Sequence, residues 1–321
     1  MRVISFVFLM IITHDVYSGS LGTKAAGNIP AYGMIPNLGL DLHTGEDGNY
    51  KIYERFVPYG MSYALFQNTN YDDHALEANF SFRYIFDDSR IGKSKDTVKD
   101  WKSFSQFFFS YTGEFDFYYN KDEKPYRESE PVINRLNNFG FHYTRFYPNN
   151  KSSLNYGEIS VEHRSNGQSD NAETIDAEVK YDNEEYQAFD TLSRGANYVT
   201  IKTGHRANKG FTYQAGFKIY LSQSADVTWG PLADKKPDFE DYDRLRLSAS
   251  YAFSRVTLTG QYTVGDIRSK GDSVDFIVVF PFNRWGFELP IIFKVHEGPM
   301  ENLSNYTQRT TSYGIGLALK Y

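Results

Sequence analysis

The sequence predicts an all-β fold, a transmembrane antiparallel β-barrel of about 12 strands. Three observations predict it. Segments along most of the chain alternate between apolar and polar residues. The 321 residues include 26 Tyr and 26 Phe, although a mean hydropathy of −0.53 excludes the long apolar runs of a helical membrane protein. The connections between the segments alternate between short and long along the chain. Such amphipathic rings suit a protein at a membrane–water boundary.

The alternation is clearest in four segments. In residues 75–86, every second side chain is aliphatic or aromatic and those between are mainly polar, and residues 211–221, 256–264 and 311–321 repeat the pattern. Successive side chains of a strand point to opposite faces, so each segment has one apolar and one polar face. Each predicted strand is close to the roughly 9–11 residues that a tilted transmembrane strand needs. The predicted strands are 59–69, 75–86, 104–118, 134–147, 154–164, 194–204, 211–221, 245–253, 256–264, 273–281, 286–294 and 311–321.

The connections after even-numbered strands are mostly short, and those after odd-numbered strands are mostly long. This is typical of outer-membrane barrels, whose long loops face the outside of the cell. The connection at 87–103 breaks the rule by being long, and the one near 70–74 by being short. The short connections are 205–210, 254–255 and 282–285, and the long ones are 119–133, 165–193, 222–244 and 295–310.

Alternation alone does not say which face points outward. A soluble β-sandwich or lipocalin-like barrel would turn the apolar face inward. Here the polar face is rich in Thr, Ser, Gln, Gly, Arg, Lys and Glu. Twelve strands enclose a lumen too wide for apolar side chains to fill, so we expect a hydrogen-bonded polar interior and an apolar outer face.

The first residues have the pattern of an export signal. Arg2 supplies a positive charge, residues 3–13 are apolar, and small residues follow. We expect a signal peptide at 1–20, a periplasmic segment at 21–55 and the barrel at 56–321. The chain has no cysteine, so no disulfide holds an exported fold together. A net charge of −6, from 34 basic and 40 acidic residues, argues against a nucleic-acid partner.

Candidate catalytic residues lie on two neighbouring predicted strands. His163 and Ser165 are two residues apart, on the apolar face of the strand at 154–164. An imidazole at this spacing can take the proton of a serine nucleophile, and an ionisable side chain facing lipid is costly enough to call for a function. Asn197 lies on the apolar face of the next strand, where a neutral amide can orient the imidazole more cheaply than a carboxylate. His-x-Ser is a common tripeptide, however, and the residues alone leave a barrel without catalytic activity open.

The motif around these residues resembles a known family. His163-x-Ser165-Asn166-Gly167 and Ser193-Arg194-x-x-Asn197 are similar to segments of the outer membrane phospholipase A family, twelve-stranded enzyme barrels of Gram-negative bacteria. Weaker similarities occur at 56–59, 110–112 and 125–128. The resemblance implies that Ser165 is the nucleophile, His163 the general base and Asn197 the residue that orients His163. The implied reaction is hydrolysis of phospholipid acyl esters at the first or second glycerol position, in the outer membrane.

The resemblance also implies a calcium ion and a homodimer that is the active state. Calcium prefers oxygen ligands. These would be the main-chain oxygen of Gln168, the hydroxyl of Ser193 and, from a second subunit, Glu123. Backbone N–H groups between Ser165 and Gly167 would stabilise the oxyanion.

The chain departs from the family pattern in several places. Gln168 stands where an Arg is often found, Glu123 replaces a small hydroxyl residue, and Ala196 replaces a bulky aromatic residue. An insertion at 171–192 separates the two motifs. Two other functions therefore stay open, a non-catalytic channel or structural barrel and a soluble exported lipid-binding barrel.

Overall fold

The fold was analysed in a computed structural model of the chain. The structure describes residues 43–44, 47–51, 55–70, 74–98, 102–118, 132–147, 154–166, 194–205, 210–223, 238–253, 255–266, 271–284, 287–301, 303 and 309–319. The signal peptide predicted at 1–20 lies outside these residues. No helix within the described ranges is long and apolar enough to cross a bilayer.

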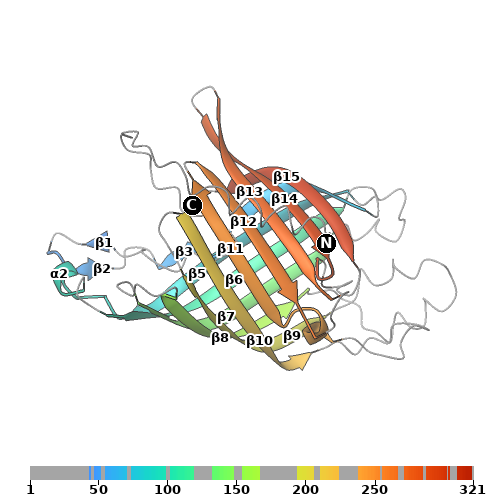
Figure 1. Ribbon diagram of the computed structural model, residues 1–321. Coiled ribbons are helices and arrows are strands. Elements are labelled where there is room, and N and C mark those ends of the chain that lie inside the picture. Colours follow the sequence, from blue (N-terminus) through green and yellow to red (C-terminus); the bar gives the residue numbers. More distant parts are fainter. Residues whose placement is uncertain are drawn as a thin grey trace, which may run out of the picture.

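Among the described residues, twelve long antiparallel strands close into a barrel (Figure 1). Each strand pairs with its neighbours in the sequence, and the ring is closed by the pairing of the first strand with the last. The twelve-strand prediction is therefore confirmed. The strands are β4 (Ser62–Thr69), β5 (His74–Asp88), β6 (Phe104–Tyr118), β7 (Val132–Phe146), β8 (Tyr156–Ser165), β9 (Gly195–His205), β10 (Gly210–Gln223), β11 (Leu245–Phe253), β12 (Val256–Val264), β13 (Ser273–Arg284), β14 (Phe287–Gly298) and β15 (Thr310–Leu319).

The predicted strand at 59–69 is wrong at its start. Strand β4 begins at Ser62, and a separate short strand, β3 (Phe56–Pro58), precedes it. The cause is the length of β5, because its first half pairs with β4 and its second half with β3. Between β3 and β4, the Gly60 N–H donates to the Ser81 hydroxyl at 3.0 Å, and Tyr59 is buried inside the barrel.

The long connection between β5 and β6 contains a short helix that lies beside an N-terminal two-stranded sheet. It contains a one-turn helix, α2 (Lys95–Val98), beside the two-stranded sheet of β1 (His43–Thr44) and β2 (Tyr50–Lys51). A bridge between Asn49 and Ser94 joins the two parts, which lie together at one end of the barrel (Figure 1).

The apolar face of the strands points outward, as predicted. Val161 and Ile201 on β8 and β9, and Ile315 on β15, are 55%, 49% and 58% exposed. The residues between them are polar and buried, such as Ser160 and Thr200. This arrangement is that of a transmembrane barrel and is the opposite of a soluble barrel, in which the apolar face is inside.

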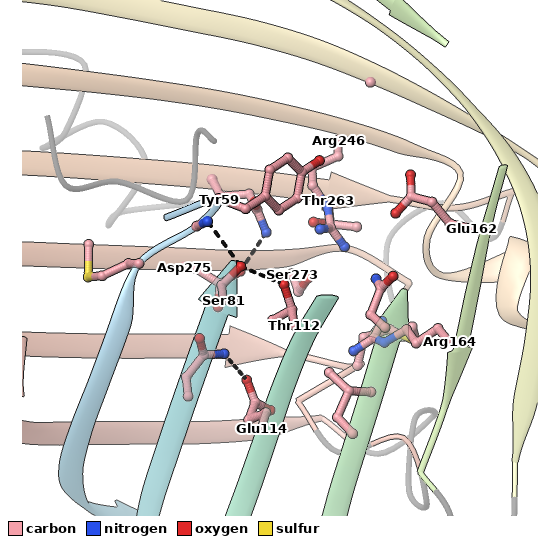
Figure 2. A pocket seen from close by; sticks show the side chains of 18 of the residues that line it. Tyr59, Ser81, Thr112, Glu114, Glu162, Arg164, Arg246, Thr263, Ser273 and Asp275 are labelled. Carbon is pink, nitrogen blue, oxygen red and sulfur yellow. Dashed lines mark hydrogen bonds between the residues drawn. The ribbon is translucent and has the colours of Figure 1, made fainter. Parts of the chain in front are cut away.

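Side chains and one loop fill much of the lumen. At the rim that carries the short turns, Tyr59 packs with Phe108 and Tyr156. At the opposite rim, which we call the long-loop rim because it carries the β8–β9 and β10–β11 connections, the 3₁₀ helix η6 (Phe239–Asp241) packs against Tyr198. A cavity of about 280 Å³ is lined by residues that include Glu162 and Arg164 (Figure 2).

Candidate functional site

The candidate site lies on the outer face of the barrel at the long-loop rim. Strands β8 and β9 pair so that His163 is opposite Asn197 and Ser165 is opposite Gly195. Ser165 is the last residue of β8 and Gly195 the first of β9. Alternation places Glu162 and Arg164 in the lumen, where they line the cavity, so His163 between them points to the apolar outer surface.

His163 and Asn197 are joined by a hydrogen bond. The His163 Nδ1 lies 2.9 Å from the Asn197 Oδ1. An amide oxygen only accepts hydrogen bonds, so this contact selects the tautomer in which Nδ1 carries the proton. The other ring nitrogen, Nε2, is then the acceptor. This is the tautomer that a general base for a serine hydroxyl requires.

Asn197 is in turn held by a residue that the sequence did not suggest. Its Nδ2 donates to the Ser222 hydroxyl at 2.8 Å. Ser222 is on β10, and the register of β10 against β9 shifts between Tyr220 and Ser222, which is a β-bulge. Three neighbouring strands thus contribute one continuous set of side chains, in the order His163, Asn197 and Ser222.

The position opposite Ser165 is occupied by a glycine. A Cβ built on Gly195 would lie 3.3 Å from the Ser165 Cβ and 3.6 Å from the His163 Cε1. The Arg164 carbonyl oxygen would also lie 3.3 Å from this Cβ, so the serine, the imidazole and the β8 backbone all closely border the position that a side chain at Gly195 would take. Gly195 was also missed by the sequence reasoning, since a glycine at a strand end is an ordinary boundary signal.

Apolar side chains surround the polar group. The ring of Phe139 on β7 lies 5.0 Å from the His163 imidazole, measured between centroids. Phe139, Val161 and Leu221 are 40%, 55% and 61% exposed on the outer face. Apolar side chains from β7, β8 and β10 thus lie around the imidazole.

The two sequence motifs meet directly behind Ser165. The Arg194 N–H donates to the Asn166 Oδ1 at 2.8 Å, and the Asn166 N–H donates to the Arg194 carbonyl at 3.1 Å. Both residues are buried. These bonds fasten together the two ends of the connection at 167–193. They also occupy the Asn166 N–H, which corrects the expectation that this group serves the oxyanion. Gly167, the next expected donor, lies outside the described residues.

The inner side of the same rim is held by a buried charge cluster. Asp243, which follows η6, contacts Lys218 Nζ at 2.5 Å and Arg246 Nη2 at 3.2 Å, and Arg164 lies 3.7 Å away. Burial by itself would raise the pKa of the Asp243 carboxyl, but these three cations together hold that pKa well below its usual range.

The same loop supports the bulge from inside. The Tyr220 hydroxyl donates to the Asp243 carbonyl at 3.2 Å, and the Tyr220 ring packs on Tyr198 and Phe239. Tyr198 and Tyr220 are paired across β9 and β10, beside the pair of Asn197 and Ser222. The lumen side of these strands is thus anchored next to the candidate site.

The predicted calcium ligands cannot be placed, because Gln168, Ser193 and Glu123 all lie outside the described residues, as does the insertion at 171–192. No group of three His, Cys, Asp or Glu side chains suited to a metal is present in the described ranges. The chemistry of the three ligands fits the ion, since a carbonyl, a hydroxyl and a carboxylate are the oxygen donors that calcium takes. The Asn166–Arg194 pair places the attachment points of Gly167 and Ser193 side by side.

No family model matches the sequence, and no curated protein does. Among solved structures, outer membrane phospholipase A from Escherichia coli matches with a TM-score of 0.59 and 15% identity, covering 83% of this chain and 94% of that chain. The calcium-bound dimer of the Salmonella typhi outer membrane phospholipase matches with a TM-score of 0.57, also at 15% identity, covering 83% and 92%.

These matches confirm the predicted resemblance at the level of the fold. The chain spans nearly the full length of both structures. At this identity the likeness extends to the barrel and not to individual residues. The assignment of roles to His163, Ser165 and Asn197 therefore rests on the geometry described above and on the sequence motifs.

Proposed function

We propose that this chain is a calcium-dependent phospholipase of the A1/A2 type that acts in the outer membrane of a Gram-negative bacterium. The observation that carries the proposal is the His163–Asn197 hydrogen bond on the lipid-facing side of the barrel, next to Ser165. Placing a polar pair on an apolar, lipid-facing surface is energetically unfavourable. A catalytic role in a membrane-embedded hydrolase would explain why the pair is there.

The proposed reaction follows from the tautomer of His163. The Nε2 atom takes the proton of the Ser165 hydroxyl while Oγ attacks the ester carbonyl carbon. The tetrahedral intermediate collapses when the C–O bond to glycerol breaks, and His163 returns the proton to the departing glycerol oxygen. Water then attacks the acyl-serine ester with His163 again as base. The products are a fatty acid and a lysophospholipid, and Ser165 is regenerated.

Asn197 holds the proton on Nδ1 through the reaction and stabilises the imidazolium that forms when Nε2 accepts a proton. A neutral amide suits a lipid-facing position, because an ionised carboxylate there would lose its hydration. Gln168 and Ser193, with Glu123 of a second copy, would hold calcium beside the site. When bound, the ion supplies positive charge for the developing oxyanion. A homodimer, as in the Salmonella structure, would complete the ligand set.

The channel alternative is less well supported. Ion pairs link side chains inside the lumen, such as Lys294 with Glu77 at 2.5 Å and Lys202 with Glu158 at 2.8 Å. Together with the buried aromatic residues at both rims, they narrow the described part of the lumen, in which a cavity of about 280 Å³ lies.

The deciding experiment is fatty-acid release from phospholipid–detergent mixed micelles by the purified full chain. We expect release with calcium, loss of release with a chelator, and recovery when calcium is restored. Ser165→Ala and His163→Ala should abolish release while the variants still migrate as folded barrels in unheated gels. If wild type releases no fatty acid at any calcium concentration, or if Ser165→Ala is as active as wild type, the proposal is wrong.

A further inference from the structure

The bulge in β10 turns one hydroxyl to the outside of the barrel. Along β10, Phe217 and Ile219 face outward and are exposed, whereas Lys218 between them is buried in the lumen. Strict alternation would send Ser222 inward with Lys218. Instead, the register shift places Ser222 opposite Asn197, and Ser222 is exposed. Bulges of this kind re-aim a side chain and are frequent next to active sites.

The outward-facing hydroxyl of Ser222 supplies a hydrogen-bond acceptor for the Asn197 amide. An amide that gives its oxygen to His163 has two N–H donors left, and the surrounding surface is apolar. An N–H group facing hydrocarbon without an acceptor is unfavourable. The Ser222 Oγ accepts from the Asn197 Nδ2 at 2.8 Å, which satisfies one of these two N–H groups.

We propose that Ser222 is a positioning residue of the site, which holds the Asn197 amide in the orientation that presents its oxygen to His163. This inference rests on the proposed hydrolase function and deepens it. Without Ser222, the amide is free to rotate. A flipped amide presents its NH₂ group to the His163 Nδ1, and the imidazole must then carry its proton on Nε2, where it cannot act as a base for Ser165.

The geometry separates this role from support of the fold. The bulge is anchored on the lumen side through Tyr220, which packs on Tyr198 and Phe239 and bonds to the Asp243 carbonyl. Ser222 itself is exposed, and its hydroxyl accepts the hydrogen bond from the Asn197 Nδ2. Removing the hydroxyl should therefore leave the strand pairing in place and change only the freedom of the amide.

The first test is steady-state kinetics in mixed micelles. Ser222→Ala should lower kcat about threefold to tenfold with KM unchanged, as expected when one neutral hydrogen bond is lost. Ser222→Thr, which keeps the hydroxyl, should restore most of kcat. As a matched control, Thr311→Ala removes a hydroxyl that donates to Glu297, away from the site, and should leave kcat unchanged. If Ser222→Ala has the kcat of wild type, the inference is overturned.

A double-mutant cycle tests whether Ser222 acts through Asn197. In an Asn197→Ala background, Ser222→Ala should cause no further loss of kcat, because the amide that it positions is gone. Additive losses in the two variants would mean that Ser222 acts by another route, and they would overturn the inference.

A spectroscopic measurement keeps the inference separate from the proposed function. Nitrogen-15 NMR of the His163 imidazole in micelles reports which ring nitrogen carries the proton. Wild type should be mainly in the Nδ1–H form, and Ser222→Ala should lower that fraction while Ser222→Thr preserves it. An unchanged tautomer in Ser222→Ala overturns the inference. A third outcome is possible, in which Ser222→Ala shifts the tautomer of His163 but the wild type releases no fatty acid in the micelle assay. That outcome overturns only the phospholipase proposal.

Discussion

Ser165 and Gly195 lie directly opposite each other in the β8–β9 ladder, and a Cβ on Gly195 would be 3.3 Å from the Ser165 Cβ. A side chain at position 195 would therefore be in close contact with the proposed nucleophile, and glycine avoids this contact. Such a contact is tighter than ordinary van der Waals packing, so a larger residue would crowd both Ser165 and His163.

Gly195→Val should lower lipolytic activity at least about tenfold, because a branched side chain would crowd Ser165 and His163 and displace them from their working geometry. The barrel should still form, since Val favours strands. Gly157→Val is the matched control. Gly157 is on the same outer face of β8, and its nearest contact for a new Cβ is the Lys202 carbonyl at 4.0 Å. Equal activity of the two variants would contradict the prediction.

Asn197→Ala should lower kcat about tenfold or more, because it removes the acceptor that keeps the proton on the His163 Nδ1. The expected loss is larger than that of Ser222→Ala, since Asn197 contacts the imidazole directly. KM for the micellar substrate should change little. The measurement is fatty-acid release over a range of substrate concentrations. A variant with a raised KM and a normal kcat would place Asn197 in substrate binding instead.

Asp243→Asn should destabilise the barrel at neutral pH by about 3 kcal/mol or more, because Lys218, Arg246 and Arg164 would lose their shared buried partner. The pKa of Asp243 is lower in the folded chain than in the unfolded chain. The stability that its charge contributes is therefore fully present above the ordinary aspartate pKa of about 3.9 and declines as pH falls below it toward the folded-state pKa.

The measurement is the unfolding temperature of wild type and Asp243→Asn in detergent, followed by circular dichroism between neutral pH and pH of about 2. The gap between the two proteins should be widest above pH of about 4 and narrow in more acidic buffer. A gap that stays constant across this range would show that the carboxylate charge is not the source of the stability.

Wild type should show no large, steady conductance in planar bilayers. The reason is that Tyr59 and η6 are packed in buried clusters near the two ends of the lumen and ion pairs such as Lys294–Glu77 lie between them. A combined Phe239→Ala and Asp243→Ala variant should conduct more, because two of the contacts that hold η6 in the lumen are removed. A stable open channel in wild type would favour the non-catalytic barrel over the enzyme.

Local alternation of residues, together with the connection lengths and the composition of the polar face, was sufficient to predict the barrel. A strand has a side-chain period of two, so the apolar and polar faces can be read from each segment without knowledge of its neighbours. The same rule placed His163, Ser165 and Asn197 on the outer face, where the structure has them. The boundary at Ser62 was missed because the break before it depends on β5, a strand that pairs with both β3 and β4.

The relationships that complete the site were decided by the tertiary structure. Ser222 belongs to the inner face by alternation, and only the bulge between β9 and β10 turns it toward Asn197. The bond between Asn166 and Arg194 joins residues 28 positions apart and removes one expected oxyanion donor. Asp243 enters the lumen from a loop that has no periodic pattern. The physical reason is common to all three. Alternation reports which face a residue takes within one strand, whereas bulges, loop closures and buried charge clusters depend on the partners that pairing and closure of the sheet bring together.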